Sequence, residues 1–211
     1  MLICKRIEYK EAVDFLLPRH YSGRIPSISY AFGWFQYDKL KAVCTFGMPA
    51  SPFLCKGIAG EKWKSNVLEL NRLCREDDFD IQLSQFVAWC LRQLKKHNLI
   101  IVSYSDTAMN HHGYIYQACN FYYTGKTKQR TDKYTESGKH ARHYSNDNQG
   151  KYIVVRSAKY RYVYICADKR TKREMLKDLK YPILNYYPKG DNSKDYMLGD
   201  YLQREIIEVK I

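Results

Sequence analysis

The spacing of hydrophobic residues along the chain changes between helical and strand periodicity. Apolar positions three and four apart predict helices at residues 8–17 and 81–97. Residues 99–104 begin with four consecutive apolar residues, a pattern typical of a buried strand. Aromatic and β-branched runs predict a hairpin formed by residues 29–37 and 40–46.

The remaining elements are shorter and alternate in type. Further strands are predicted at 67–73 and 122–124, a second hairpin at 152–156 and 159–167, helices at 112–121 and 170–179, and a loop at 48–60. Aspartates at 77, 78 and 80 predict the N-cap of the long helix. This alternation of strands and helices indicates an α/β (α+β) domain built on a mixed sheet.

The chain is long enough for one hydrophobic core. It has 211 residues, 45% of them hydrophobic, and we expect one domain over residues 1–190 with a C-terminal tail or extension over 191–211. Its apolar runs are far shorter than the ~20 residues of a membrane span, and we see no secretory signal. Seven cysteines without a C-x-x-C pair indicate reduced thiols, mostly in the core, and a cytoplasmic location.

Positive charge is concentrated in one part of the chain. Lys and Arg number 35 against 22 Asp and Glu, a formal net charge of +13. Residues 126–170 hold twelve basic and four acidic residues, 12 − 4 = +8, with six tyrosines among them. This combination is typical of nucleic-acid binding, because phosphates give affinity and rings stack on bases. A solvated basic surface over core tyrosines is the alternative. The candidate contacts are Lys126, Lys128, Arg130, Lys159 and Arg161.

Polar residues follow directly on the predicted strand at 99–104. Ser105 and Asp106 lie at its C-terminal end, where sheet-based sites form. In the next predicted helix, Tyr116 and Asn120 are one turn apart. An aspartate and a tyrosine hydroxyl near one strand end favour general acid–base chemistry. Alternatively, Asp106 caps the helix that follows it and Tyr116 belongs to the core.

Three motifs of the central segment occur in a fixed order. They are LNRL at 70–73, SYSD at 103–106 and GYIYQACNFYYTG at 113–125. This block resembles the conserved block of the bacteriophage Mom-type adenine-modification proteins, which belong to the GNAT acyltransferase superfamily. Two outer pieces also resemble that family, HYSGR at 20–24 and KYRYVY at 159–164. The resemblance therefore spans most of the chain.

The resemblance implies both a fold and an activity. The fold is a GNAT-like single domain whose mixed, mostly antiparallel central sheet is flanked by helices and whose central strands splay apart. The activity is the addition of a carbamoylmethyl (glycinamide-like) group to adenine N6 in DNA, which protects phage DNA from host restriction. The protein would then work in the cytoplasm of a host cell on double-stranded DNA.

The resemblance also suggests roles for single residues. Adenine N6 is a weak nucleophile because its lone pair is delocalised, so it needs a base and accurate placement. Asp106 is the predicted base or orienting group and Tyr116 the proton donor to the leaving group. Ser105 and Asn120 would hold these groups by hydrogen bonds. We expect the adenine to be flipped, because a stacked base cannot present N6 to a pocket. The loop residues expected near the base or its phosphates are His20, Tyr21 and Arg24.

The resemblance places an acyl donor in the splay, against the start of the long helix. The residues expected near it are Asn71, Arg72, Leu83, Ser84 and Gln85. Strand alternation points the side chains of Asn71 and Arg72 to opposite faces, so we expect only one of them in the site. The helix start has DFDIQLS where GNAT enzymes usually carry Gln/Arg-x-x-Gly-x-Gly/Ala. Two donors therefore stay open, acetyl-CoA and an aminoacyl-tRNA such as glycyl-tRNA, the latter making tRNA a second partner.

The histidines do not form a strong metal-ligand set. His111 and His112 are adjacent and diverge on a helix, whereas His140 and His143 lie in a basic stretch that favours phosphate contact or exposure. We therefore assign no residue to a metal. Two other classes of function stay open: a GNAT-type acyltransferase for tRNA, a protein or a small molecule, and a non-enzymatic DNA-binding protein on the same fold.

Overall fold

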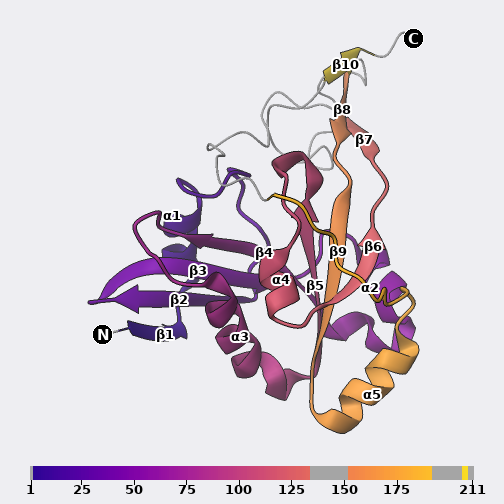
Figure 1. Ribbon diagram of the computed structural model, residues 1–211, viewed down its shortest axis with the longest axis horizontal. Coiled ribbons are helices and arrows are strands. Elements are labelled where there is room, and N and C mark those ends of the chain that lie inside the picture. The colour runs from indigo at the N-terminus through magenta and orange to yellow at the C-terminus, as the bar shows by residue number, and fades with distance from the viewer. Residues whose placement is uncertain (1, 134–151, 192–205, 209–211) are drawn as a thin grey trace.

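The computed structural model describes residues 2–133, 152–191 and 206–208. Within them, seven strands form one sheet in the order β1-β2-β3-β4-β5-β9-β6, and three form a second sheet in the order β10-β8-β7 (Figure 1). Every neighbouring pair is antiparallel except β4 and β5. The strands are β1 Leu2–Arg6, β2 Tyr30–Gln36, β3 Lys39–Gly47, β4 Val67–Arg75, β5 Leu99–Asp106, β6 Tyr122–Lys126, β7 Arg130–Lys133, β8 Tyr152–Arg156, β9 Lys159–Cys166 and β10 Ile206–Glu208.

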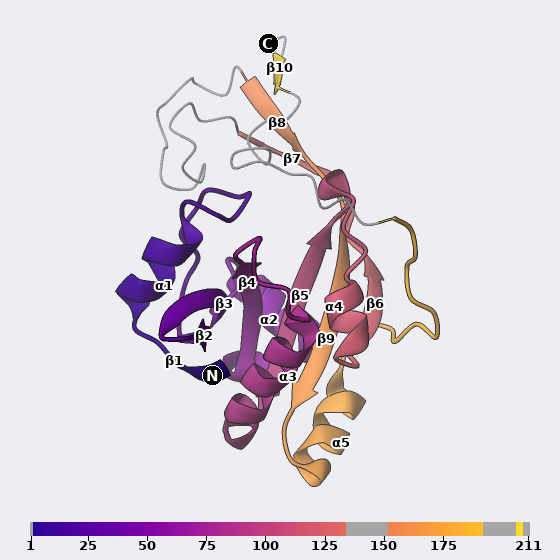
Figure 2. The same ribbon diagram turned by 60° about the vertical axis from the view of Figure 1, so that its left-hand side comes forward.

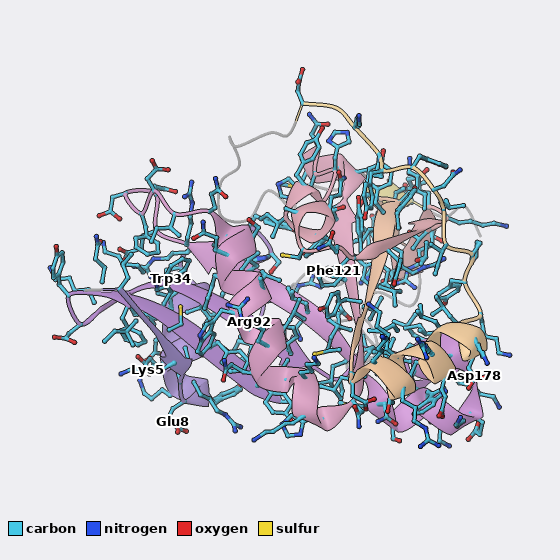
Figure 3. The ribbon with its side chains drawn as sticks, turned by 60° about the horizontal axis from the view of Figure 1, so that its bottom comes forward. Lys5, Glu8, Trp34, Arg92, Phe121 and Asp178 are labelled. Atoms are coloured by element: carbon cyan, nitrogen blue, oxygen red, sulfur yellow. The ribbon has the colours of Figure 1, made fainter. Side chains whose placement is uncertain are left out.

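Helices cover both faces of the large sheet. They are α1 Tyr9–Leu16, α2 Pro52–Ala59, α3 Leu83–Leu94, α4 Tyr114–Ala118 and α5 Lys169–Asp178, with short 3₁₀ turns at Glu61–Asn66, Lys95–His97 and Thr107–Met109. Helices α3 and α4 lie on one face, and α1, α2 and α5 on the other (Figure 3). The expected GNAT-like arrangement, a mixed and mostly antiparallel sheet flanked by helices, is confirmed.

The core explains why these segments form these elements. In β5, Ile101 packs under α3 while its neighbour Ile100 packs under α2 and α5, so the strand is apolar on both faces. All seven cysteines are free and six are buried, which confirms that they are core thiols. None of the described helices is both long and apolar enough to cross a membrane.

The first hairpin is confirmed, with a turn one residue earlier than the sequence suggests. Strands β2 and β3 pair through a two-residue turn at Tyr37 and Asp38, which have φ values of 47° and 62°. Two positive φ values give the turn the twist of the flanking strands.

The predicted loop at 48–60 is wrong, because it contains helix α2. Pro52 occupies the first turn, where a missing N–H costs nothing, and Gly60 with φ of 80° ends the helix. Cys55 and Ile58 are its buried side chains. Pro52 and Gly60 therefore mark the two ends of a helix, while Gly57 lies within it.

The predicted hairpin at 152–167 is also wrong, because β8 and β9 belong to different sheets. The Ser-Ala pair between them lacks the residues that favour positive φ in a tight turn. Instead, the Ala158 carbonyl accepts a hydrogen bond from the Thr107 amide and the Ser157 hydroxyl donates to Asp106. The chain thus continues from β8 into β9, and the small sheet projects from the large one (Figure 2).

Candidate active site

The central parallel strands β4 and β5 separate along their length. They pair only where Val67, Leu68 and Glu69 face residues 100–102, and beyond this point each strand continues without pairing to the other (Figure 2). At the start of the opening, the Ser103 hydroxyl donates to the Leu70 carbonyl at 2.9 Å. The splayed central pair expected from the family resemblance is therefore confirmed.

A β-bulge lies in β4 at the opening. Thr45 pairs with Arg72 and Phe46 with Leu70, which leaves Asn71 as an extra residue. The bulge interrupts the strict alternation on which the expectation of a single site residue from Asn71 and Arg72 was based, and that expectation stays a prediction. The Asn71 side chain accepts from Thr45 Oγ1 at 2.7 Å and donates to the Ser27 carbonyl at 2.7 Å.

The bulge holds the loop at residues 20–29 over the opening. The Arg72 guanidinium donates to the carbonyls of Asn71 at 2.6 Å and Arg24 at 3.1 Å. Gly47 makes a further close contact, because a Cβ there would lie 1.9 Å from the Ser27 carbonyl oxygen. The loop that carries the predicted residues His20 and Arg24 is thus fixed to both β3 and β4.

Five titratable side chains are connected here by electrostatic interactions, which run from His20 to Arg72, His111 and Lys159 and from Glu69 to Arg72 and Lys159. We call them the splay cluster: His20, Glu69, Arg72, His111 and Lys159. They come from the loop after α1, from β4, from the loop after β5 and from the start of β9. Three of them, His20, Arg72 and Lys159, were named from the sequence. The topology brings them together from residues up to 139 positions apart (159 − 20).

Glu69 was not named from the sequence. Burial raises the pKa of this carboxyl group, against the opposing charges of Arg72 and Lys159. No hydrogen bond or ion pair to its carboxylate occurs among the described residues. A half-buried carboxylate with a raised pKa and no hydrogen bond within the described part of the chain is a candidate proton acceptor. The only sign of Glu69 in the sequence is that an acidic residue stands between Leu68 and Leu70 in a strand where apolar and polar residues alternate.

His20 is held as a neutral imidazole. Burial lowers its pKa to about 3, and the nearby charges of Arg72 and Lys159 add to this. The Ser22 amide donates to Nδ1 at 3.1 Å, so the ring proton lies on Nε2. The ring stacks on Tyr21 with 4.4 Å between centroids. His20 can therefore donate one hydrogen bond and take part in a stack of flat rings.

Asp106 is buried, and its carboxylate already makes three polar contacts. Its carboxylate caps the Ala108 amide at 3.0 Å, accepts from Ser157 at 2.5 Å and pairs with Lys159 at 3.0 Å. Burial opposes ionisation, but the Lys159 charge and these hydrogen bonds lower the pKa of Asp106 overall. The capping role left open by the sequence is confirmed by this contact. A carboxylate with a lowered pKa is a weak proton acceptor.

The other predicted catalytic residues lie on the α4 side. Burial raises the pKa of Tyr116 to about 12, while a hydrogen bond with Ser103 lowers it. The Ser105 hydroxyl is buried and has no hydrogen-bond partner among the described residues. Asn120 does not lie one helical turn from Tyr116 as expected, because α4 ends at Ala118 and Asn120 has a left-handed φ of 59°.

The start of α3 leaves its first amides without a side-chain cap but follows an acidic segment. Its N-cap, Gln82, makes no side-chain capping bond. The predicted caps are wrong, since the acidic segment at 76–80 precedes the helix and Asp78 pairs with Lys41 instead. Phosphates bind helix starts through free amides and positive potential, which this acidic segment opposes.

The three residues at the start of α3 that were predicted to lie near the donor have different surroundings. Leu83 packs against the core, and Gln85 is exposed. The Ser84 carbonyl accepts from the Cys119 thiol at 3.2 Å, which fastens α4 to the first turn of α3.

The basic stretch is divided between surface and interior. Lys126, Lys128 and Arg130 are exposed on β6, β7 and the segment between them. Arg161 faces inward instead, because its guanidinium donates to Thr124 and covers the Tyr181 ring at 3.4 Å. Arg161 therefore packs against the sheet, and its role as a DNA contact stays a prediction. The His140–His143 pair lies outside the described residues, which contain no group of three or more potential metal ligands.

Solved structures with a similar arrangement are acetyltransferases. The ribosomal-protein-S18-alanine N-acetyltransferase from Escherichia coli is 10% identical, with a TM-score of 0.47 over 79% of this chain and 95% of its own. A probable acetyltransferase from Staphylococcus epidermidis ATCC 12228 is 10% identical, with a TM-score of 0.49 over 78% and 99%. An N-acetyltransferase from Staphylococcus aureus Mu50 is 11% identical, with a TM-score of 0.47 over 79% and 98%.

Comparison of the sequence with known protein families identifies the family of this chain. No curated protein sequence matches the chain. The profile of the Mom protein family matches residues 1–189, which include every residue of the splay cluster. Because the match covers nearly nine-tenths of the 211 residues, the chain belongs to the Mom protein family.

Proposed function

We propose that this protein modifies adenine in double-stranded DNA at the exocyclic N6, adding a carbamoylmethyl (glycinamide-like) group that protects the DNA from restriction nucleases. The observation that carries the proposal is Glu69 at the mouth of the splay, a half-buried carboxylate with a raised pKa and no hydrogen bond or ion pair among the described residues. Membership in the Mom protein family and the +13 charge support the same substrate.

Glu69 serves as the proton acceptor in this proposal. N6 attacks only as it loses a proton, so the base must have a pKa closer to neutrality than an ordinary carboxylate has. The raised pKa of Glu69 meets this need, and the lowered pKa of Asp106 does not. Asp106 instead orients Lys159 through their ion pair and acts as a positioning residue.

Tyr116 serves as the proton donor. Its pKa of about 12 keeps the hydroxyl protonated at neutral pH. The hydroxyl lies beside Ser103, whose own hydroxyl spans the start of the opening. Tyr116 can thus protonate a leaving group that lies between β4 and β5, on the opposite face of the sheet from Glu69.

The loop at 20–29 and the exposed basic residues recognise the DNA. The stacked rings of His20 and Tyr21 offer a flat surface for a flipped adenine. Arg24 lies beside them, and the exposed Lys126, Lys128 and Arg130 offer phosphate contacts.

The donor in this proposal is an aminoacyl ester such as glycyl-tRNA. Its phosphates belong to the RNA and do not need the start of α3, where the acidic segment at 76–80 opposes a pyrophosphate. Attack of N6 on the ester carbonyl forms an N6-glycyl amide and releases the tRNA 3′-oxygen, which takes the proton of Tyr116. The carbamoylmethyl group is the isomer of this amide: the free glycyl amine attacks purine C6 through a five-membered ring, the original C6–N6 bond breaks, and the old N6 becomes the terminal amide.

The test is nucleoside analysis of DNA from cells that express the protein. Plasmid is digested to nucleosides and searched by mass spectrometry for deoxyadenosine carrying the added group. We expect it with the wild-type protein and with Glu61→Gln, an exposed control on the turn before β4, and expect its loss in Glu69→Gln. Unmodified DNA from cells that contain soluble wild-type protein would overturn the proposal.

A further inference from the structure

Three exposed apolar side chains border the splay cluster. We call them the apolar rim: Ile25, Met48 and Phe53, which are 50%, 49% and 87% exposed. They lie in the loop after α1, in the segment after β3 and in the first turn of α2. Single exposed hydrophobic residues are common on protein surfaces, so their number alone carries no argument. What sets these three apart is where they lie and how rigidly their backbone is held.

The rim lies directly beside the residues of the proposed site. Ile25 follows Arg24, whose carbonyl accepts from Arg72. Met48 follows Gly47, which pairs with Glu69 across β3 and β4. The loops that carry Ile25 and Met48 touch, because the Ser27 carbonyl packs directly on Gly47.

Phe53 extends the rim along α2. It precedes Cys55 by two residues, and Cys55 is buried close enough to Glu69 for their charges to interact. The buried side of this helix therefore faces the site region, while its exposed first turn carries Phe53 outward.

Each rim residue lies next to a proline. The pairs are Ile25-Pro26, Met48-Pro49 and Pro52-Phe53. Proline restricts the residue before it, which applies to Ile25 and Met48, whereas the backbone of Phe53 is held by the first turn of α2. These segments therefore lose little backbone freedom on binding. A rigid apolar projection next to cationic side chains is suited to a partner that has a charged exterior and an apolar interior.

We propose that the apolar rim is a wedge that enters the base stack of duplex DNA and takes the space left by the flipped adenine. The inference rests on the proposed function. Apolar side chains inserted between base steps unstack and hold open a duplex, and a flipped base needs its former space filled. Phosphate contacts by Arg24 and the exposed lysines at 126 and 128 would bring the rim to the groove.

The test compares two triple variants of the full chain. Ile25→Ser/Met48→Ser/Phe53→Ser removes the rim. Leu2→Ser/Tyr9→Ser/Tyr37→Ser is the control, because those side chains are similarly exposed at 50%, 54% and 77% but lie on β1, α1 and the β2–β3 turn. All six are surface positions, so both variants should fold.

The main readout needs no donor. Permanganate oxidises thymines that are unpaired or unstacked, so bound duplex is probed with it. We expect wild type and the control variant to raise thymine oxidation severalfold over free duplex, and the rim variant to bind within about threefold of wild type without raising it. If the rim variant raised thymine oxidation as much as wild type, the wedge proposal would be overturned. The apolar rim would then be better explained as a binding surface for a protein.

Modified deoxyadenosine in cells separates the two proposals. Modification by wild type and its loss in the rim variant support the wedge. Modification by both proteins at equal levels overturns the wedge and leaves the proposed function standing. Its absence with wild type overturns the proposed function, while the permanganate result still decides whether the rim opens duplex DNA.

Discussion

Replacing Gly47 by alanine should damage both stability and activity. The new Cβ would lie 1.9 Å from the Ser27 carbonyl oxygen, so the loop at 20–29 must retreat by at least 3.0 − 1.9 = 1.1 Å. This movement strains two hydrogen bonds, from Asn71 to Ser27 at 2.7 Å and from the Ser29 amide to the Phe46 carbonyl at 2.8 Å. At about 1 kcal/mol each, their loss lowers the free energy of unfolding by about 2 kcal/mol. The melting temperature should fall by roughly 4–8 °C.

The same movement displaces His20 and Arg24 from the rest of the splay cluster. A shift of about 1 Å at a reacting centre costs on the order of 100-fold in rate, so modified deoxyadenosine should fall by about that factor. Gly57→Ala is the matched control, because its nearest contact, the Tyr181 hydroxyl, would be 3.5 Å away and alanine favours helix α2. A Gly47→Ala protein with wild-type melting and wild-type modification would refute this account of the loop.

Three further predictions concern single groups. Glu69→Gln should raise the free energy of unfolding at pH 8. Because the pKa of Glu69 is raised in the fold, ionising this carboxyl group destabilises the folded state once the pH is above the group's usual pKa. Urea unfolding should therefore show the gain at pH 8 and none at pH 4. Asp106→Asn should cost about 1.5–3 kcal/mol at pH 7, since it removes the charge from the Asp106–Lys159 contact. Because the pKa of Asp106 is lowered, that cost should shrink as pH falls below its usual 3.8, which thermal unfolding from pH 7 to 2 measures. Tyr116→Phe should slow modification by roughly 100- to 10,000-fold, measured as the early rate of product formation, and equal rates would exclude it as proton donor.

The sequence predicted the elements that have long and regular patterns. Helix α3 and strand β5 were predicted because their apolar residues repeat over many positions and no tertiary contact opposes them. Helix α2 was missed because Pro52 and Gly60 occur at its ends, where they favour helix starts and stops as well as loops, and because Gly57 within it lowers its helix propensity. The false hairpin at 152–167 shows that strand propensity alone does not identify a pairing partner.

The candidate site could be predicted only in part. Lys159 stood out as part of a basic stretch typical of nucleic-acid binding, while the family resemblance pointed to His20 near the base or its phosphates and to Arg72 near the donor. Glu69 did not, because its significance depends on the missing partner and on burial, and both arise from pairing between distant strands. The bulge at Asn71 is likewise a property of strand register, which no local pattern specifies.

The pairing of β5 with β9 sets the timing of folding during synthesis. Leu99 pairs with Cys166, 67 residues later, and β4 shares only three residue pairs with β5. At about 5–20 residues per second, the apolar β5 waits roughly 3–13 s on the ribosome before its long partner is made. Throughout that interval it is an exposed strand edge rich in β-branched residues, which is the kind of segment that aggregates. Slow translation of residues 107–158 would lengthen this exposure, so the yield of folded protein should depend on how fast that stretch is made.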